Sequence, residues 1–154
     1  MSKLILPTLA VLALAAPAAQ AQSTRKLDKR FLKADVSRDN LLNPQEFQAS
    51  QGKRVSAALS LFRFNRADTN DDGFLSMSEF RASKAGMTGG KASRLDIFLT
   101  ADLDKDNELD PDEYLSTLPP RIAYPKAFRS FGKRDKDKNG GLTPREFGIR
   151  RFPL

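Results

Sequence analysis

Apolar residues recur along this chain in four similar units, each built around an acidic stretch. In every unit a phenylalanine stands one helical turn before the stretch, a leucine lies inside it and an aromatic residue follows it directly. The leading residues are Phe31, Phe64, Phe98 and Phe131, the leucines are Leu42, Leu75, Leu109 and Leu142, and the following residues are Phe47, Phe80, Tyr114 and Phe147. The leading phenylalanine belongs on the inward face of an entering helix, and the following aromatic begins the core face of an exiting helix. The pattern predicts one helix–loop–helix unit repeated four times.

Each acidic stretch has the ligand spacing of a calcium loop. The stretches span residues 35–46, 68–79, 102–113 and 135–146, and each opens with aspartate and closes with glutamate. Calcium takes six to eight oxygens, which a 12-residue loop presents from side chains at positions 1, 3 and 5, a carbonyl at position 7 and a bidentate carboxylate at position 12. The predicted ligands are Asp35, Ser37, Asp39, Leu41 and Glu46; Asp68, Asn70, Asp72, Phe74 and Glu79; Asp102, Asp104, Asp106, Glu108 and Glu113; and Asp135, Asp137, Asn139, Gly141 and Glu146.

The four loops differ in how closely they follow the calcium pattern. The second and fourth loops depart from it nowhere. The third has Asn107 where glycine usually makes the sharp turn, and asparagine tolerates the left-handed conformation that this turn needs. The first is the weakest, because Ser37 supplies a neutral oxygen where a carboxylate or amide would bind better.

This arrangement resembles the EF-hand superfamily, and from about residue 25 to 151 the chain is similar to calmodulin-like proteins with four hands. The resemblance implies an all-α fold of two lobes, in which paired loops form short two-stranded β ribbons and their leucines meet. The expected divisions are a first pair of hands over residues 22–85, a glycine-rich hinge over 86–91 and a second pair over 92–154. Because this hinge replaces the long central helix of calmodulin, we expect the lobes to lie close together. Residues 150–154 are interpreted as a frayed helix end.

The beginning of the chain has the pattern of a secretory signal peptide over residues 1–21. Lys3 precedes an apolar run from Leu4 to Ala16, and the small-residue sequence Ala19-Gln20-Ala21 follows it. The alternative is a membrane-spanning helix, but the run is shorter than the roughly 20 residues that a span needs, and prolines interrupt it. We therefore expect cleavage after Ala21 and a periplasmic or secreted protein without a transmembrane anchor. With no cysteine, the chain forms no disulfide.

Charge is distributed unevenly between the loops and the rest of the chain. The formal net charge is +7 at pH 7, yet every acidic residue except Asp28 and Asp96 lies inside a loop. Calcium binding would therefore expose a cationic surface, for which anionic envelope components are candidate partners. Arg25, Lys29 and Lys33 follow one another at helical spacing and form the best candidate contact. The alternative is an ordinary solvated helix face, and nothing in the sequence indicates specific nucleic-acid binding.

These features predict an exported calcium-binding protein that holds up to four Ca²⁺ and acts as a buffer or a calcium-stabilised envelope protein. The alternative is a calcium sensor that recruits a protein partner or an anionic envelope surface when loaded. Only Met77 and Met87 remain after signal cleavage, which disfavours the methionine-rich groove of a promiscuous regulator. A dockerin-like assembly module is disfavoured by the phenylalanines of the entering helices. No catalysis is expected, because histidine and cysteine are absent.

Overall fold

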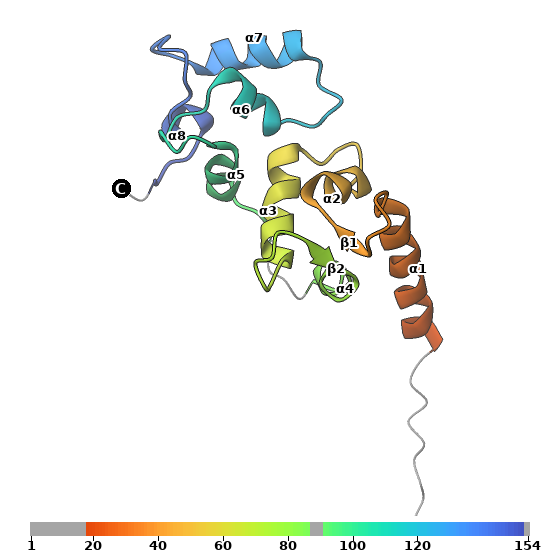
Figure 1. The fold of residues 1–154 in the computed structure, drawn as a ribbon. Helices are drawn as coiled ribbons and strands as arrows, with labels where there is room; N and C mark the ends of the chain where they lie inside the picture. Colours follow the sequence, from red (N-terminus) through yellow and green to blue (C-terminus); the bar gives the residue numbers. More distant parts are fainter. Residues whose placement is uncertain (1–17, 87–90, 153–154) are drawn as a thin grey trace, which may run out of the picture.

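The computed structural model describes residues 18–86 and 91–152. The expected signal peptide therefore falls almost entirely outside the described residues, and so does the centre of the expected hinge, residues 87–90. Within the described part the fold is mostly helical, with eight helices and one two-stranded antiparallel sheet, as the sequence predicts (Figure 1). None of the described helices is both long enough and apolar enough to cross a bilayer.

Entering and exiting helices alternate along the chain. The entering helices are α1 (Ala18–Ala34), α3 (Ala57–Ala67), α5 (Arg94–Ala101) and α7 (Tyr124–Arg134). The exiting helices are α2 (Pro44–Ser50), α4 (Met77–Lys84), α6 (Pro111–Ser116) and α8 (Pro144–Phe147). The leading phenylalanine of each unit accepts a hydrogen bond at its carbonyl from the N–H of the first loop residue, so every entering helix ends where its loop begins.

The loops pair as the leucine pattern predicts. Strands β1 (Leu41–Leu42) and β2 (Leu75–Ser76) form an antiparallel ribbon in which Leu42 lies opposite Leu75. In the second half a single antiparallel bridge joins Leu109 to Leu142. The first loop therefore pairs with the second, and the third pairs with the fourth.

Each pair of loops has its own aromatic core. The first holds the rings of Phe31, Phe47, Phe64 and Phe80, with Phe31 packed edge-on against Phe80 at 5.6 Å between centroids. The second is formed by Phe98, Tyr114 and Phe131 with the two bridge leucines, and Phe147 is only partly buried against it. The aromatic positions of the repeat are thus the core positions, as expected from their spacing.

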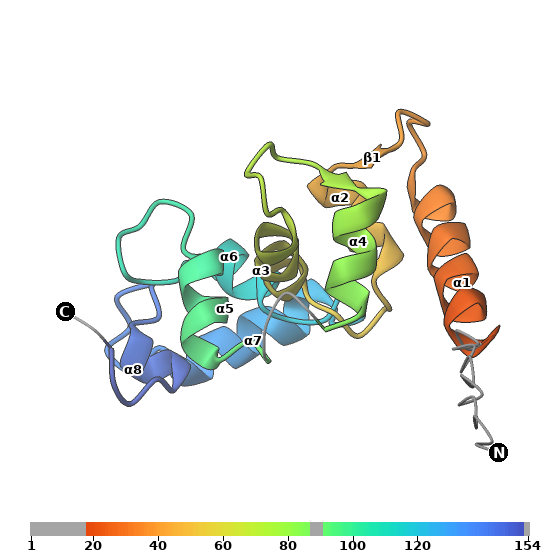
Figure 2. The ribbon, with the colours of Figure 1, turned by 90° about the horizontal axis from the view of Figure 1, so that it is seen from below.

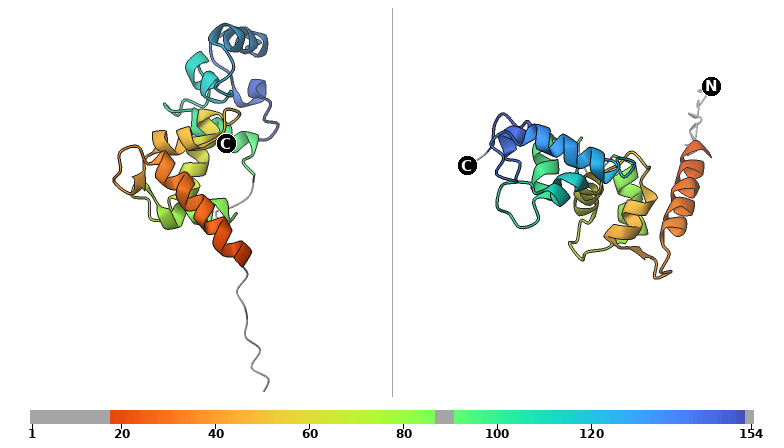
Figure 3. Two further views of the ribbon diagram at one scale, coloured as in Figure 1. Left: turned by 90° about the vertical axis from the view of Figure 1, so that its right-hand side faces the viewer. Right: turned by 90° about the horizontal axis from the view of Figure 1, so that it is seen from above.

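The lobes contact one another through α3 and α5, which lie side by side (Figure 2). Ala58 at the start of α3 is 3% exposed and belongs to the second core rather than the first. Helix α1 lies at one end of the molecule and α7 at the other (Figure 3). The expectation that the lobes lie close together is confirmed.

The C-terminal segment corrects one expectation from the sequence. Helix α8 ends at Phe147, because Gly148 adopts the left-handed conformation with φ of 99° and caps it. Beyond the cap Ile149 is buried, and the ring of Phe152 lies 5.8 Å from that of Phe98. These residues are therefore a non-helical segment packed on the second core, and the interpretation as a frayed helix end is wrong for residues 150–152.

Candidate metal centre

The closing glutamate of each loop links the two ends of that loop. In the second loop, Glu79 accepts a hydrogen bond from the N–H of Thr69 at 3.0 Å with one oxygen and from the N–H of Ser76 at 2.9 Å with the other. The same links join Glu46 to Val36 and Asn43, Glu113 to Leu103 and Asp110, and Glu146 to Lys136 and Thr143. Position 12 is thereby held beside positions 2 and 9 in all four loops.

This position follows from a capping box at the start of every exiting helix. The residue at position 9 is the N-cap, and its side chain accepts from the N–H of the glutamate at position 12. The N-cap residues are Asn43, Ser76, Asp110 and Thr143. The spacing of a Ser, Thr, Asn or Asp three residues before a glutamate is visible in the sequence, and the capping box that it forms holds the closing carboxylate in place.

The opening aspartate is held by the sharp turn at position 6. The N–H of Gly73 donates to Asp68 Oδ2 at 2.9 Å, and Asn107 makes the equivalent bond to Asp102 at 3.2 Å. Asn107 has φ of 67°, so asparagine takes the left-handed conformation that the third loop was predicted to need. Positions 4 and 6 have positive φ in all four loops. The residues at position 4 are Arg38, Asp71, Lys105 and Lys138, and those at position 6 are Asn40, Gly73, Asn107 and Gly140.

The residues at positions 5 and 7 are also joined locally. The N–H at position 7 donates to the side-chain oxygen at position 5, from Leu41 to Asp39, Phe74 to Asp72, Glu108 to Asp106 and Gly141 to Asn139. These bonds span 2.7 to 2.9 Å. In each loop the predicted side-chain ligands at positions 1, 5 and 12 therefore accept hydrogen bonds from the backbone of the same loop.

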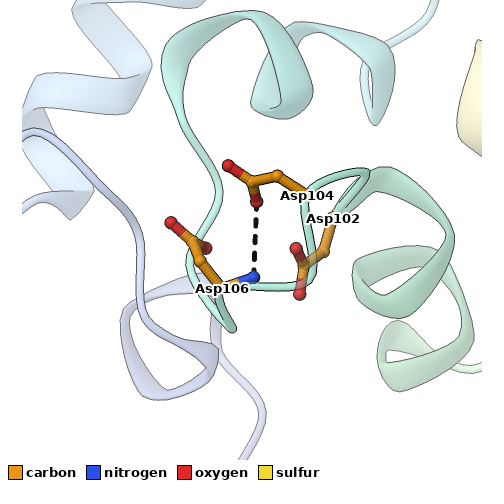
Figure 4. Close-up of side chains that lie close together, drawn as sticks. All are labelled: Asp102, Asp104 and Asp106. Carbon is orange, nitrogen blue, oxygen red and sulfur yellow. Dashed lines mark hydrogen bonds between the residues drawn. The ribbon is translucent and has the colours of Figure 1, made fainter.

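The third and fourth loops bring carboxylates together. Asp102, Asp104 and Asp106 each have a carboxylate oxygen within 4.8 Å of the others (Figure 4), and Asp135, Asp137 and Glu146 form a second such group. Three negative charges this close repel one another unless a cation lies between them. The first two loops do not form such a group among the described residues.

Two carboxylate oxygens in these groups lack partners. Oδ1 of Asp102 and Oδ1 of Asp135 are buried and accept no hydrogen bond from any described residue. An unpaired buried carboxylate oxygen is costly, so it marks a place where a ligand belongs. The donors of each loop are carboxylate, amide and hydroxyl oxygens, which are the ligands of a hard cation such as Ca²⁺. The residues present therefore fit calcium.

The first two loops are more self-contained. In the first, Asp35 Oδ1 accepts from the N–H of Arg38 at 2.6 Å and from the Ser37 hydroxyl at 3.2 Å, and Asp35 Oδ2 accepts from Asn40. In the second, the amide of Asn70 donates to Asp72 at 2.8 Å. The side-chain bonds from Ser37 and Asn70 would compete with calcium for these carboxylates.

Hydrogen bonds keep three closing glutamates ionised. The N–H of Ser37 lowers the pKa of Glu46, and the N–H of Lys136 lowers the pKa of Glu146. Burial opposes ionisation of Glu79, but the hydroxyl and N–H of Ser76 and those of Thr69 lower its pKa to about 2. These carboxylates are therefore charged at neutral pH, as calcium ligation requires.

One contact of the site was not predicted from the sequence. The side chain of Glu108 leaves the third loop and reaches Asn139 in the fourth, where both of its oxygens accept from Nδ2 at 3.2 Å. The sequence places only the Glu108 carbonyl in the site. No local pattern indicates this contact, because it depends on how the two loops pair.

Comparison with known proteins agrees with this geometry. Residues 63–82 and 95–118 match the model of the EF hand family. Two segments of the chain are therefore similar to EF hands. The matched segments include the whole of the second and third loops with flanking helix, and the family supports calcium binding. The sequence matches no curated protein.

Two solved structures resemble the fold. A redox protein from Chlamydomonas reinhardtii is similar with a TM-score of 0.37 and 18% identity, over 86% of this chain and 49% of that protein. A homolog of programmed cell death 6 protein from Leishmania major Friedlin has the same TM-score of 0.37 and 18% identity, over 80% of this chain and 72% of that one. The chain spans about half the length of the Chlamydomonas protein.

Proposed function

We propose that the chain is an exported calcium-binding protein whose four loops hold up to four Ca²⁺, and that it acts as a buffer or a calcium-stabilised envelope protein. The observation that carries the proposal is the pair of unpartnered buried oxygens on Asp102 and Asp135, each inside a group of converging carboxylates. A divalent cation would satisfy these oxygens and offset the repulsion between the carboxylates.

The loops are expected to differ in affinity. The third loop offers carboxylates at positions 1, 3 and 5 together with Glu113, so it should bind most tightly. The first should bind most weakly, because Ser37 is neutral and its hydroxyl donates to Asp35 at 3.2 Å. Chemistry at the sites is limited to ligation, and we propose no catalytic step.

The contact between the lobes favours a buffer or structural role over recruitment of a partner. Helix α3 lies along α5 and buries Ala58 in the second core. Apolar surface of the second lobe is thereby covered from within the molecule. A sensor has to expose such a surface when calcium binds.

The alternative role, a calcium sensor that engages an anionic envelope surface or a protein, is supported by the first entering helix. Leu32 on α1 is 58% exposed, Val36 in the first loop just after α1 is 77% exposed, and the exposed Lys29 and Lys33 lie on α1. Apolar and cationic side chains together suit an anionic surface. This alternative predicts that calcium increases the exposed apolar area.

Calorimetric calcium titration with a hydrophobic-surface dye read in parallel separates the two roles. Binding near millimolar affinity without a rise in dye signal supports the buffer or stabilised protein. Binding near micromolar affinity with a rising signal supports the sensor. The absence of any binding heat would contradict both.

Export is tested separately by the N-terminus of the protein recovered from cells. Cleavage after Ala21 and recovery from the periplasm or medium support the proposal. An intact N-terminus on protein confined to the cytoplasm would contradict it.

A further inference from the structure

The fourth loop carries less negative charge than its neighbours. Its acidic residues Asp135, Asp137 and Glu146 are balanced by Lys136, Lys138 and Arg145 within the same loop. At position 5 the other loops have Asp39, Asp72 and Asp106, whereas this one has the neutral Asn139. A divalent cation entering the loop therefore meets no net negative charge from the loop itself.

The missing carboxylate is supplied from the neighbouring loop. Glu108 directs its side chain across the Leu109–Leu142 bridge, and its carboxylate accepts both contacts from Asn139 Nδ2 at 3.2 Å. Asn139 Oδ1 in turn accepts from the N–H of Gly141 at 2.8 Å. Both the nitrogen and the oxygen of the Asn139 side-chain amide are therefore hydrogen-bonded, and the oxygen faces its own loop.

Gly141 leaves room for the Glu108 side chain to reach Asn139. A β-carbon at position 141 would collide with the carboxylate of Glu108. The collision involves the flexible end of the glutamate, so a side chain at this position would displace Glu108 rather than distort the backbone. Glycine at position 7 of the fourth loop is therefore a requirement of the contact, and not of the turn, which Gly140 makes with φ of 93°.

We propose that Glu108 is a positioning residue for the fourth calcium site, to which it lends its negative charge and whose ligand Asn139 it orients. The inference rests on the proposed function, since it concerns calcium binding at that loop. It assigns Glu108 two roles, with its carbonyl in the third loop and its carboxylate acting on the fourth. The affinity of the fourth site would then depend on a residue outside its own twelve.

The expected size of the effect follows from Coulomb's law. Two unit charges about 4 Å apart interact by about 1 kcal/mol in water, and a divalent ion doubles this energy, so a nearby carboxylate at somewhat longer range changes the affinity by about tenfold. Removing the charge with Glu108→Gln should therefore weaken the fourth site by about five- to tenfold. Because the loops are exposed, raising the salt concentration should reduce the difference.

The test is an NMR calcium titration of the full chain, followed at the backbone N–H groups of Gly140 and Asn107. Gly140 donates to Asp135 and Asn107 donates to Asp102, so each N–H reports on one site. Glu108→Gln should weaken calcium binding at the fourth site, reported by Gly140, more than at the third site, reported by Asn107. Gly141→Ala keeps the charge but displaces it, and should weaken binding at Gly140 in the same direction.

Asp112→Asn is the matched control. Asp112 lies in the third loop, is exposed and occupies no ligand position, so its loss removes the same charge without touching Asn139. We expect it to change binding at Gly140 by about twofold or less. Equal effects of Glu108→Gln and Asp112→Asn would overturn the proposal.

A measurement without calcium separates this inference from the proposed function. In the calcium-free protein, Glu108→Gln should shift the side-chain amide resonances of Asn139, while Asp112→Asn should not. If Gly140 does not respond to calcium in the unaltered chain, calcium binding at the fourth loop is refuted and the inference falls with it. If Gly140 responds but Glu108→Gln binds as well as the unaltered chain, the inference alone is refuted.

Discussion

Leu109 and Leu142 exchange two backbone hydrogen bonds between the third and fourth loops. The N–H of Leu109 donates to the carbonyl of Leu142 at 2.9 Å, and the N–H of Leu142 donates back at 2.8 Å. Both side chains are fully buried in the second core. Leu42 and Leu75 are paired in the same way in the first lobe. Each pair of loops is therefore anchored to its core at one shared point.

Replacing Leu142 with alanine should destabilise the second lobe. Truncating a fully buried leucine costs about 2–5 kcal/mol, through lost burial and the cavity that remains. Chemical unfolding followed by circular dichroism measures the loss. The matched variant Leu75→Ala should affect the first lobe by a similar amount, and a loss below about 1 kcal/mol in Leu142→Ala would show that this leucine is not a core residue.

Calcium should raise the melting temperature of the protein. With free calcium at about 100 times the dissociation constant, linkage stabilises the folded state by about 2.7 kcal/mol per site. Melting after chelation, then after addition of calcium, measures the change. Magnesium is the control ion, because it does not use the larger coordination shell that a bidentate glutamate completes. Identical melting curves with chelator and with calcium would contradict the account.

Several features of the fold could be predicted because they repeat. The aromatic residues beside each loop and the leucine inside it mark the two cores, and the pairing of Leu42 with Leu75 follows from the repeat. The left-handed conformation of Asn107 follows from its place in the third loop. These positions could be recognised because the same residue type recurs at the same place in each repeat.

Features that occur once could not be predicted in this way. Packing of Phe152 on Phe98 continues the chain past the last repeat, and the contact of Glu108 with Asn139 differs from the equivalent positions of the first lobe. The burial of Ala58 in the second core could not be predicted for another reason. Helix α3 directs Phe64 into the first core and Ala58 into the second, so its apolar residues serve two lobes.

Substituting Ala58 with glutamate should separate the lobes. The side chain is 3% exposed, and an unpaired charge buried there would cost several kcal/mol, which the molecule avoids by opening the contact between α3 and α5. Small-angle X-ray scattering should show a larger radius of gyration. Ser78→Glu adds the same charge at an exposed position of α4 and should leave the radius unchanged. A compact Ala58→Glu protein would refute this contact.

Lys84 should make the free energy of unfolding depend on pH in the alkaline range. Burial, with repulsion from Arg30 of α1 and Arg63 of α3, lowers the pKa of Lys84 to about 8, although its ammonium lies 5.0 Å from the Phe47 ring centroid, which partly favours the charged form. A lowered lysine pKa means that the unfolded chain binds the proton more tightly. Stability should therefore rise as the pH increases from about 8 towards the ordinary lysine value of 10.5.

The variant Lys84→Met isolates this contribution. It keeps an unbranched side chain of similar length over the rings of Phe47 and Phe80 but removes the proton that titrates. Unfolding free energies measured across the same pH range should rise less steeply than in the unaltered chain. Parallel pH profiles for the two proteins would show that Lys84 titrates normally.

Calcium binding through the closing glutamates is tested most directly by counting the ions bound to variants of the second loop. Native mass spectrometry at saturating calcium should show four Ca²⁺ on the unaltered protein and one fewer on Glu79→Gln. Asp71→Asn, which removes an exposed carboxylate from a non-ligand position of the same loop, should retain all four. The same count in Glu79→Gln as in the unaltered protein, or no bound calcium in either, would contradict the account.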